Sequence, residues 1–269
     1  MRHATCKPST LDPDTRAFYC RTQRLLREAA IPHLVGGAYA LERYTGIERH
    51  TRDFDIFLRP ADCRRALECL AQHGCRTELT HPHWLGKAHC GEHFVDVIFS
   101  SGNGLSDVDD EWFENATASR VLGEPALLCP AEEIIWTKAY IMERERFDGA
   151  DIAHLLRACG ERLDWQRLLR RFGDHWRVLY AHLVLFDFIY PGESARIAAG
   201  VRADMRERLA QGPSGSSSNT QVCQGTLLSR AQYLIDIQKW GYRDARLGRD
   251  GSMSRHEVEL WTAAIDGQD

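Results

Sequence analysis

Apolar side chains in the first hundred residues alternate between helical and strand-like spacing. Phe18, Leu25 and Leu26 recur at helical intervals, and they predict a helix over residues 15–30 that stops before Pro32. The pattern then predicts a strand at 33–35, a helix at 38–44, a strand at 53–58, a helix at 60–73, and strands at 75–79, 84–89 and 93–99. This order of elements indicates an α+β core.

The apolar spacing becomes helical from Pro130 onward, where proline suits the first turn of a helix. Helices are predicted at residues 131–144, 151–158, 165–172 and 176–188. Residues 211–221 are rich in Gly, Pro and Ser and offer almost nothing to bury, so they predict a mobile linker. We therefore expect an α/β core at 1–129, a helical domain at 130–210, a linker at 211–221 and a segment at 222–269 that docks back.

Charge and cysteine content exclude several classes of protein. The 34 basic and 38 acidic side chains give a net charge of −4 and are not collected into blocks, which argues against a general nucleic-acid coat. The nine cysteines form no C-x-x-C pair and are expected to be reduced thiols. Because the sequence has neither an apolar run of about 18 residues nor a signal-like start, we expect a cytoplasmic protein outside the membrane.

A histidine-rich run, His81, His83, His89, Cys90 and His93, has residue types that bind zinc. A turn at 81–83 followed by a hairpin over 87–99 would scatter these side chains over different faces. Solvated histidines, or histidines at the rim of a substrate site, are the favoured interpretation, and a structural zinc site is the alternative.

Two aspartates lie two residues apart on the strand predicted at 53–58. Side chains at this spacing share one face of a strand, so Asp53 and Asp55 would stand side by side while Phe54 and Ile56 face the other way. Adjacent carboxylates repel each other unless a cation or a shared proton intervenes. Carboxylate oxygens suit Mg²⁺ or Mn²⁺, ions that also bridge substrate phosphates.

A third carboxylate, Asp96, is the only charged residue of the apolar stretch 94–99. Burying it without a partner would be costly, so we expect it next to the first pair. Upstream, Gly36 and Gly37 separate an apolar strand from a helix start, where bare backbone N–H groups can approach a phosphate. A glycine pair of this kind is more often a simple turn.

The combination is more specific than its parts: a strand ending in Gly-Gly, a helix, an Asp-x-Asp strand 16 residues after Gly37, and a further strand with a lone aspartate. It resembles the polymerase-β-like nucleotidyltransferase superfamily. Gly36-Gly-Ala-Tyr-Ala-Leu41, Gly46, Arg49 and Thr51-Arg-Asp-Phe-Asp55 look most like minimal bacterial members, which include AbiEii-type toxins. The resemblance covers about residues 31–156. Many family members have Gly-Ser at the turn, whereas Ala38 follows Gly37 here.

The resemblance implies a small mixed sheet with flanking helices, followed by a helical domain. Asp53, Asp55 and Asp96 would hold Mg²⁺ or Mn²⁺ against a nucleoside triphosphate such as ATP, and Asp96 would help to deprotonate the acceptor. A nucleoside monophosphate would pass to a hydroxyl or phosphate with release of pyrophosphate. The acceptor is left open between a small molecule, a tRNA end and a protein. A degenerate fold that binds nucleotide or a partner without turnover is the alternative, and a third reading makes the aspartates plain surface residues.

Three basic residues are candidates for contacts with the nucleotide phosphates. Lys138 matches a Lys-then-Asp-x-x-Asp region of the resembling toxins, here with Asp148 and Asp151, although a lysine beside an apolar stripe also suits a snorkelling side chain. Arg49 and Arg52 flank the Asp-x-Asp strand and suit phosphate clamps or solvated partners of the acidic face.

Overall fold

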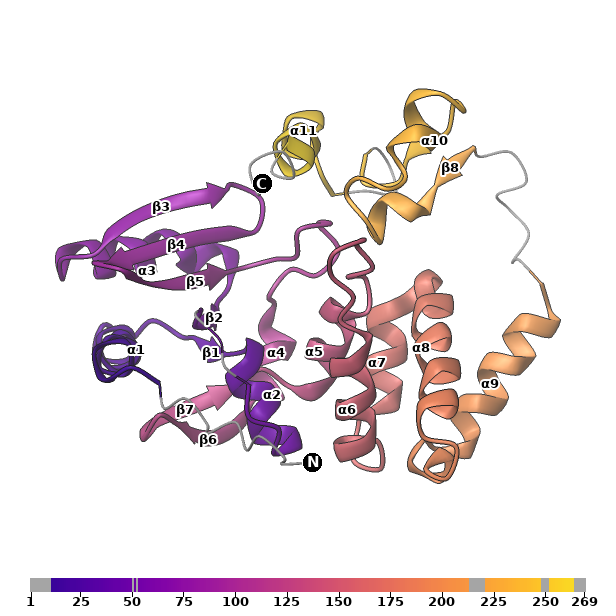
Figure 1. Ribbon diagram of the computed structural model, residues 1–269, viewed down its shortest axis with the longest axis horizontal. Coiled ribbons are helices and arrows are strands. Elements are labelled where there is room, and N and C mark those ends of the chain that lie inside the picture. Colours follow the sequence, from indigo (N-terminus) through magenta and orange to yellow (C-terminus); the bar gives the residue numbers. More distant parts are fainter. Residues whose placement is uncertain (1–10, 50, 52, 213–220, 248–251, 264–269) are drawn as a thin grey trace, which may run out of the picture.

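A mixed sheet of seven strands organises the first half of the protein (Figure 1). The computed structural model describes residues 11–49, 51, 53–212, 221–247 and 252–263. The strands are β1 (Leu34–Val35), β2 (Asp55–Phe57), β3 (Arg76–His81), β4 (Leu85–Cys90), β5 (His93–Ile98), β6 (Thr117–Val121) and β7 (Glu124–Leu128). Their order is β3-β4-β5-β2-β1-β7-β6, with β2 parallel to β5, β1 parallel to β7 and the other pairs antiparallel. The predicted fold class is confirmed.

Helices α1 (Pro13–Glu28) and α3 (Pro60–Gln72) pack against this sheet. Phe54, fully buried, stacks on Tyr19 of α1 with ring centroids 4.8 Å apart. Phe54 therefore faces α1, whereas the alternation of polar and apolar residues had predicted only that it turns away from the aspartates.

Helices dominate the chain after β7. They are α5 (Ala131–Lys138), α6 (Gly149–Cys159), α7 (Trp165–Phe172), α8 (Trp176–Ile189) and α9 (Ala199–Ala210), while α2 (Gly37–Thr45) and α4 (Asp110–Glu114) belong to the first half. The predicted boundary at residue 129 falls just after β7, and α2 packs directly against α6. Among the described residues, no helix is long and apolar enough to cross a membrane.

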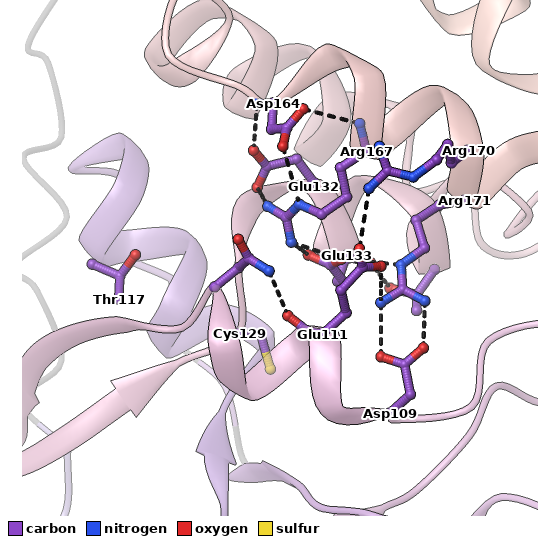
Figure 2. Close-up of polar contacts among 12 residues, drawn as sticks. Asp109, Glu111, Thr117, Cys129, Glu132, Glu133, Asp164, Arg167, Arg170 and Arg171 are labelled. Atoms are coloured by element: carbon purple, nitrogen blue, oxygen red, sulfur yellow. Dashed lines mark hydrogen bonds and ion pairs between the residues drawn. The ribbon is translucent and has the colours of Figure 1, made fainter.

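A buried ion-pair network joins the helical half to the first half (Figure 2). Glu133 of α5, fully buried, accepts hydrogen bonds from Arg167 at 2.9 Å and from Arg171 at 3.2 Å, both on α7. Arg171 also donates to Asp109 at 2.8 Å, just before α4. Because a buried carboxylate is costly without such partners, this network fixes α5 and α7 against the α4 segment.

Several features of the fold were not predicted from the sequence, among them the helices α4 and α9, to which no element had been assigned. The hairpin β6–β7 turns at Leu122 and Gly123, both with positive φ, in a stretch to which no element had been assigned. The predicted helix 131–144 ends at Lys138 instead, because the backbone N–H of Met142 donates to Leu228 and that of Glu143 donates to Arg146. A bond to Leu228, distant in sequence, and a bond to the nearby Arg146 thus replace the last helical hydrogen bonds.

The residues from 221 onward contact the core through aromatic and polar side chains. They form β8 (Val222–Cys223), β9 (Arg243–Asp244), α10 (Leu234–Gln238) and α11 (Arg255–Ala263). Trp261 of α11 meets the rings of His81 and Trp84 with centroids 5.2 Å away, and Glu143 accepts from the N–H of Arg230 at 3.1 Å. Most of the predicted linker 211–221 lies outside the described residues, and the domain division stays a prediction.

Candidate active site

Three carboxylates converge where β2 and β5 run side by side. Asp55 and Asp96 are register partners in this parallel pair, and Asp53 comes two residues before Asp55. One oxygen of each side chain lies within 4.8 Å of the others. The structure therefore brings together the three aspartates that the sequence singled out. Hard oxygen donors at this spacing fit a divalent cation such as Mg²⁺ or Mn²⁺.

Asp53 lies just before β2, although the strand was predicted to include it. The ladder nevertheless reaches this point, because the backbone N–H of Asp96 donates to the carbonyl oxygen of Phe54 at 3.0 Å. The backbone around all three carboxylates is thus fixed by the sheet.

Crowding of negative charge disfavours the ionised form of the central carboxylate. Burial, and then the charges of Asp53 and Asp96, raise the pKa of Asp55 to about 7, while Lys138 and Arg146 act in the opposite direction. Burial also raises the pKa of Asp96. Such shifts gather at functional sites, where a bound cation would reverse them.

Lys87 of β4 is a site residue that the sequence analysis missed. It is the register partner of Asp96 across the β4–β5 hairpin, and its Nζ lies 2.9 Å from Oδ1 of Asp96. The hairpin was predicted, and its two-residue turn at Gly91 and Glu92 sets Lys87 opposite Asp96. Cross-strand register was therefore the signal that could have found it.

Gly37 makes room for the Asp55 side chain, and Gly36 makes room for the ring of Phe57. A Cβ on Gly37, where φ is +53°, would lie 1.6 Å from Oδ2 of Asp55, and a Cβ on Gly36 would lie 2.2 Å from the ring of Phe57. The N–H of Gly36 already donates to the carbonyl oxygen of Asp55 at 3.0 Å. Gly37 opens α2, where the first N–H groups have no partner within the helix. Of the pair, the N–H of Gly37 is the one at the start of the helix, and Gly36 is already bonded within the sheet.

Lys138 lies in an ion-pair cluster instead of extending into solvent. Its Nζ lies 2.5 Å from Oδ2 of Asp148 and 2.8 Å from Oδ2 of Asp151, and its side chain is 15% exposed. Burial opposes ionisation of Asp148, but the hydrogen bond from Arg146 and the charge of Lys138 outweigh it and lower the pKa of that carboxyl. Lys138 and Arg146 thus bring positive charge toward Asp55 from the side of α5 and α6.

Two arginines precede the Asp-x-Asp segment, and the structure describes one of them. Arg49 pairs with Oδ1 of Asp151 and so joins the cluster around Lys138. Arg52 lies outside the described residues. The helical half and the sheet half therefore meet at this cluster, next to the three carboxylates.

The histidine-rich run is spread over separate contacts. His83 bonds to the carbonyl oxygen of Gly102 at 3.1 Å, His89 to Glu78 at 3.4 Å and His93 to Thr15 at 3.0 Å. Within the part of the chain that the structure describes, the three aspartates are the group of carboxylate, histidine and cysteine ligands close enough to share an ion. The described cysteines are free thiols.

Comparisons with known proteins found similarity only to solved structures. No family model matches this chain, and no curated protein matches its sequence. The chain is similar to the antibiotic-resistance factor ANT(2'')-Ia, at 16% identity and a TM-score of 0.45 over 64% of this chain and 98% of that one. It is also similar to an antigenic nucleotidyltransferase-like protein from Paracoccidioides brasiliensis, at 14% identity and a TM-score of 0.46 over 71% and 98% of the two chains.

A third similar structure is the lincosamide antibiotic adenylyltransferase LnuA, at 15% identity and a TM-score of 0.39 over 54% of this chain and 98% of that one. At TM-scores below 0.5, these likenesses leave the resemblance to nucleotidyltransferases to rest on the residues of the candidate site. The narrower likeness to AbiEii-type toxins stays a prediction. At these identities the likeness concerns the fold, and the roles of individual residues are proposals.

Proposed function

We propose that this protein is a divalent-metal-dependent nucleotidyltransferase. It would transfer a nucleoside monophosphate from a nucleoside triphosphate to an acceptor hydroxyl or phosphate and release pyrophosphate. The observation that carries the proposal is the convergence of Asp53, Asp55 and Asp96, with oxygens within 4.8 Å of one another beside the paired inner strands β2 and β5. Three crowded carboxylates, one with a pKa raised to about 7, are costly in the absence of a cation.

Asp53, Asp55 and Asp96 would hold Mg²⁺ or Mn²⁺, and their donor chemistry fits either ion. When bound, the cation supplies neutralisation of the charge on the triphosphate and on the group being transferred. The fixed strand backbone keeps these side chains in place, so little reorganisation is needed as charge develops.

Asp96 is the residue proposed to help remove the proton of the acceptor hydroxyl. The acceptor oxygen then forms a bond to the α-phosphorus, and the bond from that phosphorus to the bridging oxygen of the β-phosphate breaks. Pyrophosphate carries away the electron pair of the broken bond, and the proton passes through the Asp96 carboxylate to solvent. Asp96 suits this role because Lys87 holds one of its oxygens at 2.9 Å and thus fixes its orientation.

Several groups are proposed to bind the triphosphate. The N–H of Gly37 opens α2 beside Asp55, and a helix start favours anions. Lys138 and Arg49 would approach the β- and γ-phosphates from the cluster with Asp151, and Arg52 is a further candidate by its place in the sequence. These cations are already oriented by carboxylates, so phosphate binding would exchange one anionic partner for another.

The decisive experiment is pyrophosphate release from each of the four nucleoside triphosphates, with Mg²⁺ or Mn²⁺ and a total cell extract as the source of acceptors. Labelled product would reveal whether the acceptor is a small molecule, a tRNA end or a protein. We expect release that requires the metal and that falls by roughly 10²-fold or more in Asp53→Asn. Nucleotide binding without metal-dependent release under any of these conditions would instead favour the degenerate binding module.

A further inference from the structure

The ammonium of Lys87 lies at the edge of the three-carboxylate cluster. It is 2.9 Å from Oδ1 of Asp96 and 4.4 Å from the centroid of the Phe94 ring. The Lys87 side chain is 23% exposed, and that of Asp96 is 14% exposed. The β4–β5 register sets the two residues directly opposite each other, so this contact is built into the hairpin.

Among the described residues, Lys87 is the one cation within ion-pair distance of any of the three aspartates. Lys138 is nearby, but its Nζ is held by Asp148 and Asp151. Lys87 therefore offsets one of the three negative charges while the site holds no ion. A carboxylate has two oxygens, so a lysine on Oδ1 still leaves one oxygen of Asp96 for a metal.

We propose that Lys87 is a positioning residue that acts on the metal site through Asp96 and makes divalent-cation binding depend on the nucleotide. This inference rests on the proposed function. Lys87 orients the Asp96 carboxylate, and its charge repels an incoming cation, so the metal binds weakly to the protein alone. The triphosphate adds several negative charges, which outweigh the lysine and draw the ion in together with the nucleotide.

The experiment is titration of the nucleotide-free protein with Mn²⁺. The concentration of free Mn²⁺ is monitored by electron paramagnetic resonance at each step. Work at about pH 8 favours the ionised form of Asp55, whose pKa is raised to about 7. Lys87→Met removes the charge at nearly constant volume and is expected to bind Mn²⁺ on the order of tenfold more tightly than wild type. Lys87→Gln, which keeps a hydrogen-bond donor without charge, should shift affinity in the same direction, and it carries the test if the methionine variant fails to fold.

Two variants serve as matched controls. Lys239→Met deletes the same charge at an exposed position after α10 and should leave Mn²⁺ affinity unchanged. Lys87→Arg keeps the charge and should bind Mn²⁺ as weakly as wild type.

In turnover assays, Lys87→Met should reach half-maximal rate at lower Mg²⁺ but with a lower kcat, because Asp96 is no longer oriented.

The outcomes separate the two proposals. If folded Lys87→Met and Lys87→Gln bind Mn²⁺ with wild-type affinity, while Asp96→Asn weakens binding, the metal site stands and the role of Lys87 is overturned. If wild type and every Lys87 variant lack Mn²⁺ binding with and without nucleotide, the metal site and the proposed function are overturned together.

Discussion

The surroundings of Asp55 disfavour its ionised form. Its pKa is raised from 3.8 to about 7 by burial and by Asp53 and Asp96, so the folded state holds a proton that the unfolded chain would release. The stability that this proton gives is fully present below about pH 4 and is lost as the pH rises through 7. In metal-free protein, ionised Asp55 therefore destabilises the fold.

Asp55→Asn removes this effect and is expected to gain stability relative to wild type as the pH rises from 5 to 8. The gain at pH 8 should be on the order of 1–4 kcal/mol, measured by urea unfolding in chelator. Asp174→Asn, an exposed control, should follow the wild-type curve. With Mg²⁺ and nucleotide the order should reverse, because wild type alone gains a ligand-induced rise in Tm. A pH-independent difference between Asp55→Asn and wild type would contradict this account.

Lys138 combines a packing role and a proposed phosphate contact. Lys138→Ala leaves Asp148 and Asp151 without their shared cation, although Arg146 and Arg49 still offset part of the charge. We expect a loss of about 1–3 kcal/mol in stability and a rise in the KM for nucleotide. Adding Asp151→Asn should recover part of the stability but not the KM. A lowered Tm with an unchanged KM would assign Lys138 a structural role alone.

At the residue scale, the position of a side chain could be predicted from the sequence wherever a single local rule determines it. Strand alternation set Asp53 and Asp55 opposite Phe54, and the cost of a lone charge in an apolar strand placed Asp96 beside them. Lys87 was missed because its role depends on cross-strand register. The pairing of Lys138 with Asp148 and Asp151 depends on how a loop folds back after α5, which no periodicity records.

At the scale of elements, the β1–α2 turn joins the glycine pair to the acidic strand. Gly37→Ala would place a Cβ 1.6 Å from Oδ2 of Asp55, at a φ of +53° that alanine tolerates poorly. We expect Asp55 to be displaced, with loss of the Tm rise caused by Mg²⁺ and nucleotide. Gly46→Ala is the matched control: φ is also positive, at +73°, but the Cβ meets open space.

Gly46→Ala should therefore cost about 1 kcal/mol of backbone strain and keep the ligand-induced shift. Equal effects of the two alanines on the shift would mean that Gly37 serves the turn and not the site.

Elements with strong periodicity and clear end signals were predicted well, and those shaped by distant contacts were not. Helix α7 has the predicted bounds, because an apolar stripe is flanked by Asp164 as a cap and by Gly173. Helix α5 is shorter than predicted because residues 142 and 143 bond to other partners. The β6–β7 hairpin escaped notice because Leu122 at its turn adopts a positive φ that leucine seldom shows.

At the scale of the whole molecule, the candidate site lies where the sheet and the helical half of the chain meet. The sheet supplies the carboxylates, and the helical half supplies Lys138 and its partners. The segment after residue 221 contacts both halves. The N–H of Arg230 donates to Glu143 beyond α5, and Trp261 packs on Trp84 at the β3–β4 turn. The sequence indicated only that this last segment would dock. Its partners could not be predicted, because they lie between residues 81 and 143, far from this segment along the chain.

The docking of α11 should depend on Trp261. Its ring lies against His81, His83 and Trp84 with centroids 5.2 to 6.1 Å away, and the guanidinium of Arg230 lies 4.7 Å above it. Trp261→Ala removes every one of these contacts, so we expect α11 and the β3–β4 turn to open locally. Hydrogen exchange in both segments should accelerate by about tenfold or more, while β2 keeps its protection. Trp240→Ala, at a position 61% exposed, is the control and should change neither. If exchange accelerates across the whole sheet, Trp261 supports the global fold and not the docking of one segment; if exchange in α11 is unchanged, other contacts hold the segment in place.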